Sequence, residues 1–301
     1  MKLNKLYKGD LRISEIGLGA MSFMQGHEST NERILELASG YGINYLDTSD
    51  LYDKGKNEEL IGKLLQGKRQ DWVLASKVGN KWRSDGSGWD WVPSKKYILS
   101  AVEESLGRLK TDYLDLYQLH GGTLDDPFEE IVEAFELLKE QGKIKEYGIS
   151  SIRPNVFLKY AEKSRIVSNM MQYSLLDRRP EEYFSKLKEE GITVFARGTV
   201  AQGLMLNKPA QKYLSIPVHQ VLKIQKAVED TAKELHVSAM ALALKYPLLH
   251  KPVLCSVVGI RTKAQAQELG KAIDEMERLS LSDYEQIMAL LPEIKYAEHR
   301  K

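Results

Sequence analysis

The sequence predicts an α/β fold, a (β/α)8 TIM barrel spanning residues 1–301 as one domain, with an N-terminal β-hairpin as a cap. Eight short apolar runs alternate with longer amphipathic stretches, and no Pro/Gly/Ser-rich linker divides the chain. Most of the apolar runs lack polar alternation, which is typical of strands buried on both faces of a parallel sheet. Strands alternating with helices in this number predict a closed barrel.

The elements follow from these runs and from the turn residues between them. Residues 1–15 are predicted to form a hairpin around Lys8-Gly9-Asp10 that caps the barrel floor. The predicted barrel strands are 16–20, 44–47, 72–77, 113–120, 144–150, 167–173, 193–196 and 253–259. Helix start and stop signals predict helices at 31–39, 58–65, 94–109, 127–140, 154–163, 180–190, 218–235, 238–246, 263–275 and 282–290.

A doubly wound open sheet is the alternative fold for the same alternation. Its dinucleotide-binding form needs a Gly-x-Gly-x-x-Gly loop after the first strand. Here Gly17-Leu18-Gly19 stands without the third glycine, so the barrel is favoured.

The composition excludes several classes of protein. A net charge of +1 gives no sign of nucleic-acid or membrane-surface binding. Cys255 is the single cysteine, expected in a buried strand, so no intrachain disulfide can form and a cytoplasmic protein is expected. The most apolar helical stretch, 239–249, is interrupted by Lys245 and Pro247 and is too short to span a bilayer. We expect a soluble monomer with no nucleic-acid or membrane partner and no metal.

Four ionisable side chains stand at or just past three successive predicted strand ends: Asp47, Tyr52, Lys77 and His120. Each alone has a structural explanation, such as a turn, a solvated strand end or a satisfied histidine. In a barrel, however, the C-terminal strand ends form one rim, and neighbouring strands lie only about 5 Å apart. The four side chains are therefore expected to converge.

Together these groups could protonate an oxygen. A phenol titrates near about 10 and is a weak acid at neutral pH, but a nearby ammonium favours the phenolate. Lys77 can supply that ammonium, and Asp47 can hold it charged and in place. His120 can orient a carbonyl oxygen or relay a proton, and Tyr52 would protonate the oxyanion. A carbonyl reductase uses all of these groups.

The segments that carry these residues resemble the signatures of the aldo-keto reductase family. Residues 42–52 with 57–59 resemble the first signature, and residues 112–120 resemble the second. The resemblance covers essentially the whole chain. It implies a (β/α)8 barrel that binds NADPH (NADP+) without a Rossmann domain, and a catalytic tetrad of Asp47, Tyr52, Lys77 and His120.

The same resemblance implies which residues contact the nicotinamide. Ser150, Ser151 and Gln172 would hold its carboxamide, with Ser151 in place of the family's asparagine. Arg197 stands where many members have a stacking tyrosine, a pattern that resembles a bacterial subgroup. A guanidinium can stack on a ring, but the charge of Arg197 is expected to disfavour the positively charged, oxidised nicotinamide.

The remaining cofactor contacts implied by the resemblance lie after the last two strands: Gly198, Gly203, Gly259, Arg261, Lys263, Gln265 and Glu268. Many members have lysine where Gly259 stands and arginine where Gln265 stands. Arg261 and Lys263 are then the expected contacts to the 2′-phosphate, because a dianion needs a basic group. The structural alternative for these two residues is the start of a solvated helix.

The substrate side is predicted from aromatic residues on the rim. Three of the four tryptophans, Trp82, Trp89 and Trp91, lie in the loop after the third strand, and Phe23 follows the first. These rings could wall a pocket for an apolar small-molecule carbonyl substrate, or they could pack the loop onto the barrel. The loop after His120 is short, which suggests an open pocket with broad aldehyde scope.

Three functions are compatible with parts of this pattern. NADPH-dependent reduction of aldehydes or ketones uses the tetrad and the basic segment, and it is favoured. A non-catalytic NADPH-binding regulatory or redox-sensor protein is the alternative. A barrel hydrolase with paired carboxylates (Asp47 with Asp50, or Glu58 with Glu59) leaves Lys77 and Tyr52 without a role.

Overall fold

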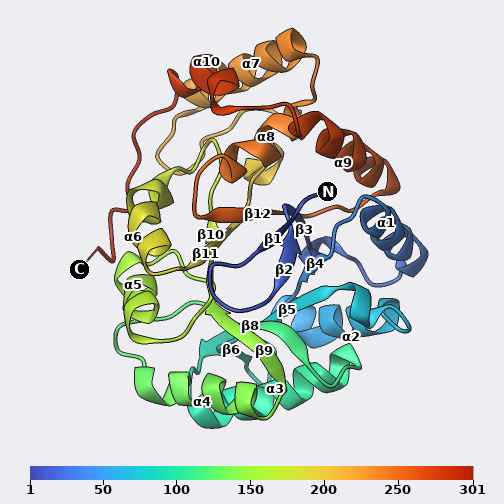
Figure 1. Ribbon diagram of the computed structural model, residues 1–301, viewed down its shortest axis with the longest axis vertical. Helices are drawn as coiled ribbons and strands as arrows, with labels where there is room; N and C mark the ends of the chain where they lie inside the picture. The colour runs from blue at the N-terminus through green and yellow to red at the C-terminus, as the bar shows by residue number, and fades with distance from the viewer. Residues whose placement is uncertain (301) are drawn as a thin grey trace.

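The computed structural model describes residues 1–300, and its centre is a closed barrel of eight strands, seen end-on in Figure 1. Every neighbouring pair in the barrel is parallel, and the last strand closes the ring against the first. The predicted (β/α)8 barrel is therefore confirmed. Its strands are β3 (Ile16–Gly19), β4 (Tyr45–Asp47), β5 (Val73–Val78), β8 (Leu114–Leu119), β9 (Ile144–Ile149), β10 (Ser168–Gln172), β11 (Thr193–Arg197) and β12 (Val253–Val258).

Helices form a ring outside the barrel (Figure 1). They are α1 (Glu28–Gly40), α2 (Lys56–Leu64), α3 (Lys95–Leu109), α4 (Phe128–Glu140), α5 (Pro154–Lys163), α6 (Phe184–Glu189), α7 (Val218–Leu235), α8 (Ala239–Leu248), α9 (Lys263–Met276) and α10 (Glu285–Met288). The helices predicted at 180–190 and 282–290 are shorter than expected, because each begins as a 3₁₀ turn. No helix within residues 1–300 is long and apolar enough to cross a membrane.

The N-terminal hairpin closes the floor of the barrel, as predicted. Strands β1 (Leu3–Lys5) and β2 (Arg12–Ser14) pair antiparallel, and the Tyr7 N–H donates to Thr193 Oγ1 at the start of β11. Apolar side chains of the hairpin join one buried cluster with side chains from the barrel interior, including Tyr45 and Phe195. The interior is thus packed from below, and the C-terminal rim is left to form a site.

A second hairpin lies on that rim and was not predicted. Residues of the tryptophan-rich loop form β6 (Asn80–Trp82) and β7 (Trp89–Trp91), which pair antiparallel. Trp82 and Trp89 pack edge to face across the hairpin, with ring centroids 5.5 Å apart. The tryptophans of this hairpin alternate with charged residues, and in the sequence this alternation was the signal for two strands.

The contact between α2 and α3 can be tested by substitution. A Cβ atom at Gly62 would lie 2.3 Å from the carbonyl oxygen of Arg108, and backbone cannot move aside as a side chain can. We expect Gly62→Ala to lower the free energy of unfolding by about 1–3 kcal/mol. Gly107→Ala on α3 is the matched control, because no atom lies within 4 Å of its Cβ position. Denaturant unfolding should show the control unchanged or more stable, and equal losses would contradict the close packing.

Candidate active site

The four tetrad candidates lie together on the C-terminal rim. Asp47 ends β4, Lys77 is the penultimate residue of β5, and His120 directly follows β8. Tyr52 stands on the segment between β4 and α2. Because β4, β5 and β8 are adjacent and parallel, their ends meet at the same edge of the barrel.

Lys77 is the centre of this group. Its side chain is 1% exposed, and its Nζ lies 2.6 Å from Asp47 Oδ2, 2.7 Å from the Thr48 carbonyl oxygen and 3.2 Å from the Tyr52 hydroxyl. An ammonium group has three N–H donors, so these partners use all of them. Since Tyr52 accepts from Lys77, its own O–H remains available as a donor.

Burial and pairing act in opposite directions on the Lys77 charge. Burial lowers the pKa of Lys77, but the charge of Asp47 and the contact with Tyr52 raise it by more, so it lies above the ordinary value. Burial raises the pKa of Asp47, and the Lys77 ammonium opposes that increase. The two groups therefore depend on each other, because removing either would leave a buried unpaired charge.

His120 completes the group and is uncharged. Its ring is nearly perpendicular to that of Tyr52, with centroids 6.1 Å apart. Burial, together with the positive charges of Lys77 and Arg197, lowers the pKa of His120 to about 3. At neutral pH the imidazole can act only through hydrogen bonds, and its Nδ1 lies 3.1 Å from Ser49 Oγ.

The segment that carries Tyr52 is anchored by the first turn of α2. The Asn57 side chain accepts from Thr48 Oγ1 (2.6 Å) and donates to the Ala20 carbonyl oxygen (2.8 Å). Glu58 is fully buried and accepts from Ser76 on β5. The Asn57-Glu58 pair of the sequence signature thus fixes the Tyr52 segment to the barrel.

A cavity of about 300 Å³ opens beside His120. Residues predicted from the sequence to act in catalysis or to bind cofactor or substrate line it, together with residues that were not predicted. The first group comprises Trp91, His120, Ser150, Ser151 and Arg197, and the second comprises Asn80, Gly121, Gly122, Thr123, Ile152 and Arg153.

The expected carboxamide-binding residues meet at the ends of β9, β10 and β11. Ser151 is buried, and its N–H donates to Oδ1 of buried Asn169 at 3.1 Å. The Gln172 amide donates to the Tyr213 hydroxyl (3.1 Å) and accepts from Arg197 (3.5 Å). Asn169 and Tyr213 were not predicted as site residues; the polar Asn169 inside the strand β10 was the one signal that the sequence contained.

The expected adenosine-binding residues gather where β12 leads into α9. Thr262 caps the helix by accepting from the Gln265 N–H (3.1 Å), and Gln265 Oε1 accepts from the Arg261 N–H (2.9 Å). Gly259, Arg261, Lys263, Gln265 and Glu268 are all exposed. A helix N-terminus with two basic side chains is suited to an anion.

Gly198 and Gly203, in the loop after β11, have φ values of 69° and 90°, in the left-handed region.

The predicted aromatic residues occupy different positions. Trp91 lines the cavity and donates from Nε1 to Asp126 Oδ1 at 2.7 Å. Trp82 donates to the Leu51 carbonyl oxygen at 3.0 Å and so ties the rim hairpin to the Tyr52 segment. Trp89 is 51% exposed, whereas Phe23 is buried in the core between barrel and helices. Their role in binding substrate stays a prediction.

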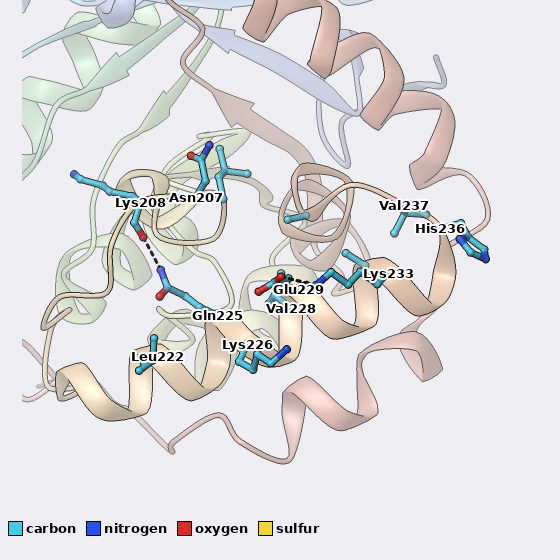
Figure 2. A pocket seen from close by; sticks show the side chains of 13 residues that line it. Asn207, Lys208, Leu222, Gln225, Lys226, Val228, Glu229, Lys233, His236 and Val237 are labelled. Carbon is cyan, nitrogen blue, oxygen red and sulfur yellow. Dashed lines mark hydrogen bonds and ion pairs between the residues drawn. The ribbon is translucent and has the colours of Figure 1, made fainter.

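A larger cavity of about 830 Å³ lies between α7 and the segment 206–208 (Figure 2). Gln225 on α7 donates to the Lys208 carbonyl oxygen at 2.9 Å and bridges its two sides. Glu229 and Lys233 pair along the same helix at 2.6 Å. None of the tetrad residues lines this cavity, so it is separate from the group around Lys77.

Comparisons with known proteins identify the family of this chain. The model of the aldo/keto reductase family matches residues 15–292. An uncharacterized oxidoreductase, YqkF of Bacillus subtilis, is 47% identical over the whole length of both chains. The holo form of the aldo-keto reductase AKR11C1 from Bacillus halodurans is 44% identical, with both chains fully covered and a TM-score of 0.93. Its apo form aligns with a TM-score of 0.83. The chain therefore belongs to the aldo/keto reductase family.

Proposed function

We propose that this protein reduces aldehydes or ketones to alcohols with NADPH, and that Tyr52 is the proton donor. The observation that carries the proposal is the saturated Lys77 ammonium, whose third donor is directed at the Tyr52 hydroxyl oxygen. Membership of a family of oxidoreductases supports the reaction class. With Cys255 as its single cysteine, the chain can form no intrachain disulfide, which supports the cytoplasmic location that we expect.

The residues on the rim fit a nicotinamide dinucleotide. Ser150, Ser151 and Gln172 offer hydroxyl and amide groups of the kind that bind a carboxamide. Arg261 and Lys263 at the start of α9 offer positive charge to a 2′-phosphate, which favours NADPH over NADH. When bound, the reduced nicotinamide would supply the hydride that reduces the carbonyl carbon.

The tetrad would then control the proton. As the carbonyl oxygen gains negative charge, it takes the proton of the Tyr52 O–H, and an alcohol forms. The electron pair left on the phenolate oxygen faces the Lys77 ammonium, which stabilises it until solvent returns a proton. Asp47 keeps Lys77 charged in its buried position, and His120 orients the carbonyl by a hydrogen bond.

The role of Tyr52 predicts a selective loss of turnover. Tyr52→Phe should lower kcat for aldehyde reduction by about 10²- to 10⁴-fold, the usual contribution of a general acid. Binding of NADPH, followed by fluorescence titration, should be almost unchanged. Tyr113→Phe is the matched control, because Tyr113 precedes β8 at the opposite end of the barrel.

Two outcomes would count against this assignment. Undiminished reduction by Tyr52→Phe would show that the proton comes from another group. Tight NADPH binding by the unmodified protein without turnover of any aldehyde or ketone would favour the regulatory or redox-sensor alternative.

The phosphate contacts predict a change in cofactor preference. Arg261→Ala combined with Lys263→Ala should raise the Kd for NADPH by about tenfold to a hundredfold, since a charge-assisted hydrogen bond contributes about 1.5–3 kcal/mol. The Kd for NADH should change little. Lys271→Ala, an exposed charge farther along α9, serves as the control. An equal loss of affinity for both cofactors would contradict the assignment of these two residues to the 2′-phosphate.

A further inference from the structure

Ser49 lies between β4 and Tyr52 and has no role in the reaction proposed above. Its hydroxyl oxygen lies 3.1 Å from Asp50 Oδ1, 3.1 Å from His120 Nδ1, and 3.2 Å from the backbone nitrogen of Leu51. The hydroxyl therefore joins a buried carboxyl group to the histidine of the tetrad.

The number of hydrogen bonds that a hydroxyl can make restricts this arrangement. A serine hydroxyl has one proton to donate and two lone pairs that accept. The Leu51 N–H occupies one lone pair of Ser49. One donor and one acceptor then remain for Asp50 and His120, so Ser49 must donate to one of them and accept from the other.

Each of these two hydrogen-bond directions fixes a different tautomer of the His120 imidazole. If Ser49 donates to an ionised Asp50, it accepts from His120, whose proton is then on Nδ1. If Asp50 is protonated and donates to Ser49, then Ser49 donates to Nδ1, and the histidine proton is on Nε2. Nδ1 is engaged by Ser49 and His120 lines the cavity, so Nε2 is the nitrogen left to face a substrate oxygen.

We infer that Ser49 and Asp50 are positioning residues for His120, and that the proton on Asp50 selects the imidazole tautomer that donates to a carbonyl oxygen. This inference rests on the proposed reductase function. Only the tautomer with Nε2–H can hydrogen-bond to the carbonyl. In the other tautomer a nitrogen lone pair would face the lone pairs of the oxygen, which is unfavourable.

The surroundings of Asp50 allow it to change protonation near neutral pH. Asp50 is 8% exposed, and its Oδ2 has no hydrogen-bond partner among residues 1–300. Burial, and then the charge of Glu58, raise the pKa of Asp50 to about 7. The Ser49 hydrogen bond, the Arg108 charge and the Leu51 N–H act in the opposite direction.

Other ionisable groups face Asp50 from the elements packed around it. Glu58 from α2 is paired with Arg108 from α3 at 2.8 Å. Tyr97 from α3 and Tyr117 from β8 also face Asp50, and burial raises the pKa of both hydroxyls above the ordinary value. The Tyr97 hydroxyl donates to the Asn80 carbonyl oxygen at 3.3 Å. His120 itself stays neutral, because its pKa is lowered to about 3.

Nuclear magnetic resonance of the histidine side chains tests the inference directly. Long-range 1H–15N spectra distinguish the two neutral tautomers and can be recorded without cofactor from about pH 5.5 to about pH 8.5. The His120 signal, assigned by its absence in His120→Gln, should change from the Nε2–H to the Nδ1–H form as the pH rises through about 7. A single tautomer across this range would overturn the inference.

Variants identify the group that controls the change. Asp50→Asn should make the His120 tautomer independent of pH, because a carboxamide does not titrate, and Ser49→Ala should do the same by removing the connection. Asp53→Asn is the matched control, since Asp53 is exposed on the same segment, and it should keep the change. A pH-dependent tautomer that persists in both Asp50→Asn and Ser49→Ala would overturn the inference.

Kinetics separate this inference from the proposed function. Above about pH 7 the kcat for carbonyl reduction should fall by up to about tenfold per pH unit in the unmodified protein. The loss should be smaller in Asp50→Asn, and an identical profile in that variant would count against the inference. If the NMR change occurs but no carbonyl is reduced at any pH, the coupling of Asp50 to His120 is supported and the reductase function is overturned.

Discussion

The buried ion pair between Lys77 and Asp47 is the interaction on which the rest of this site depends. A lysine that is 1% exposed is stable as an ammonium only if its charge is compensated and all its protons are bonded. The three partners of Lys77 meet both conditions, and two of them lie in the segment 47–48 at the end of β4. The third partner is Tyr52, so the condition for burying the charge also fixes the position of the phenol.

The architecture of the barrel explains how these groups come together without a dedicated domain. Parallel strands place the ends of β4, β5 and β8 side by side, and the N-terminal hairpin fills the opposite end with apolar side chains. The tetrad therefore rests on a packed, largely apolar interior. The first turn of α2, through Asn57 and Glu58, then holds the Tyr52 segment against this interior.

Much of this arrangement could be predicted from the sequence. Most barrel strands are apolar runs without regular polar alternation, and a polar or charged residue at the C-terminal end of such a run lies on the rim, which is why Asp47, Lys77 and His120 could be selected together. The partner and direction of a side-chain hydrogen bond, by contrast, leave no pattern in the sequence. Ser49 and Asp50 resemble ordinary turn residues, and Asn169 and Tyr213 become relevant only when the tertiary structure brings them to Ser151 and Gln172.

The rim hairpin separates one wall of the cavity from the strands that hold the charged groups. The Trp91 ring lies against Gly79, where a Cβ atom would come within 2.4 Å of the ring. One short hairpin between β5 and α3 thus supplies a wall of the cavity, whereas the ion pair between Lys77 and Asp47 belongs to the barrel strands. A change of a cavity-facing side chain on this hairpin would therefore reshape the cavity while Asp47 and Thr48 continued to hold Lys77.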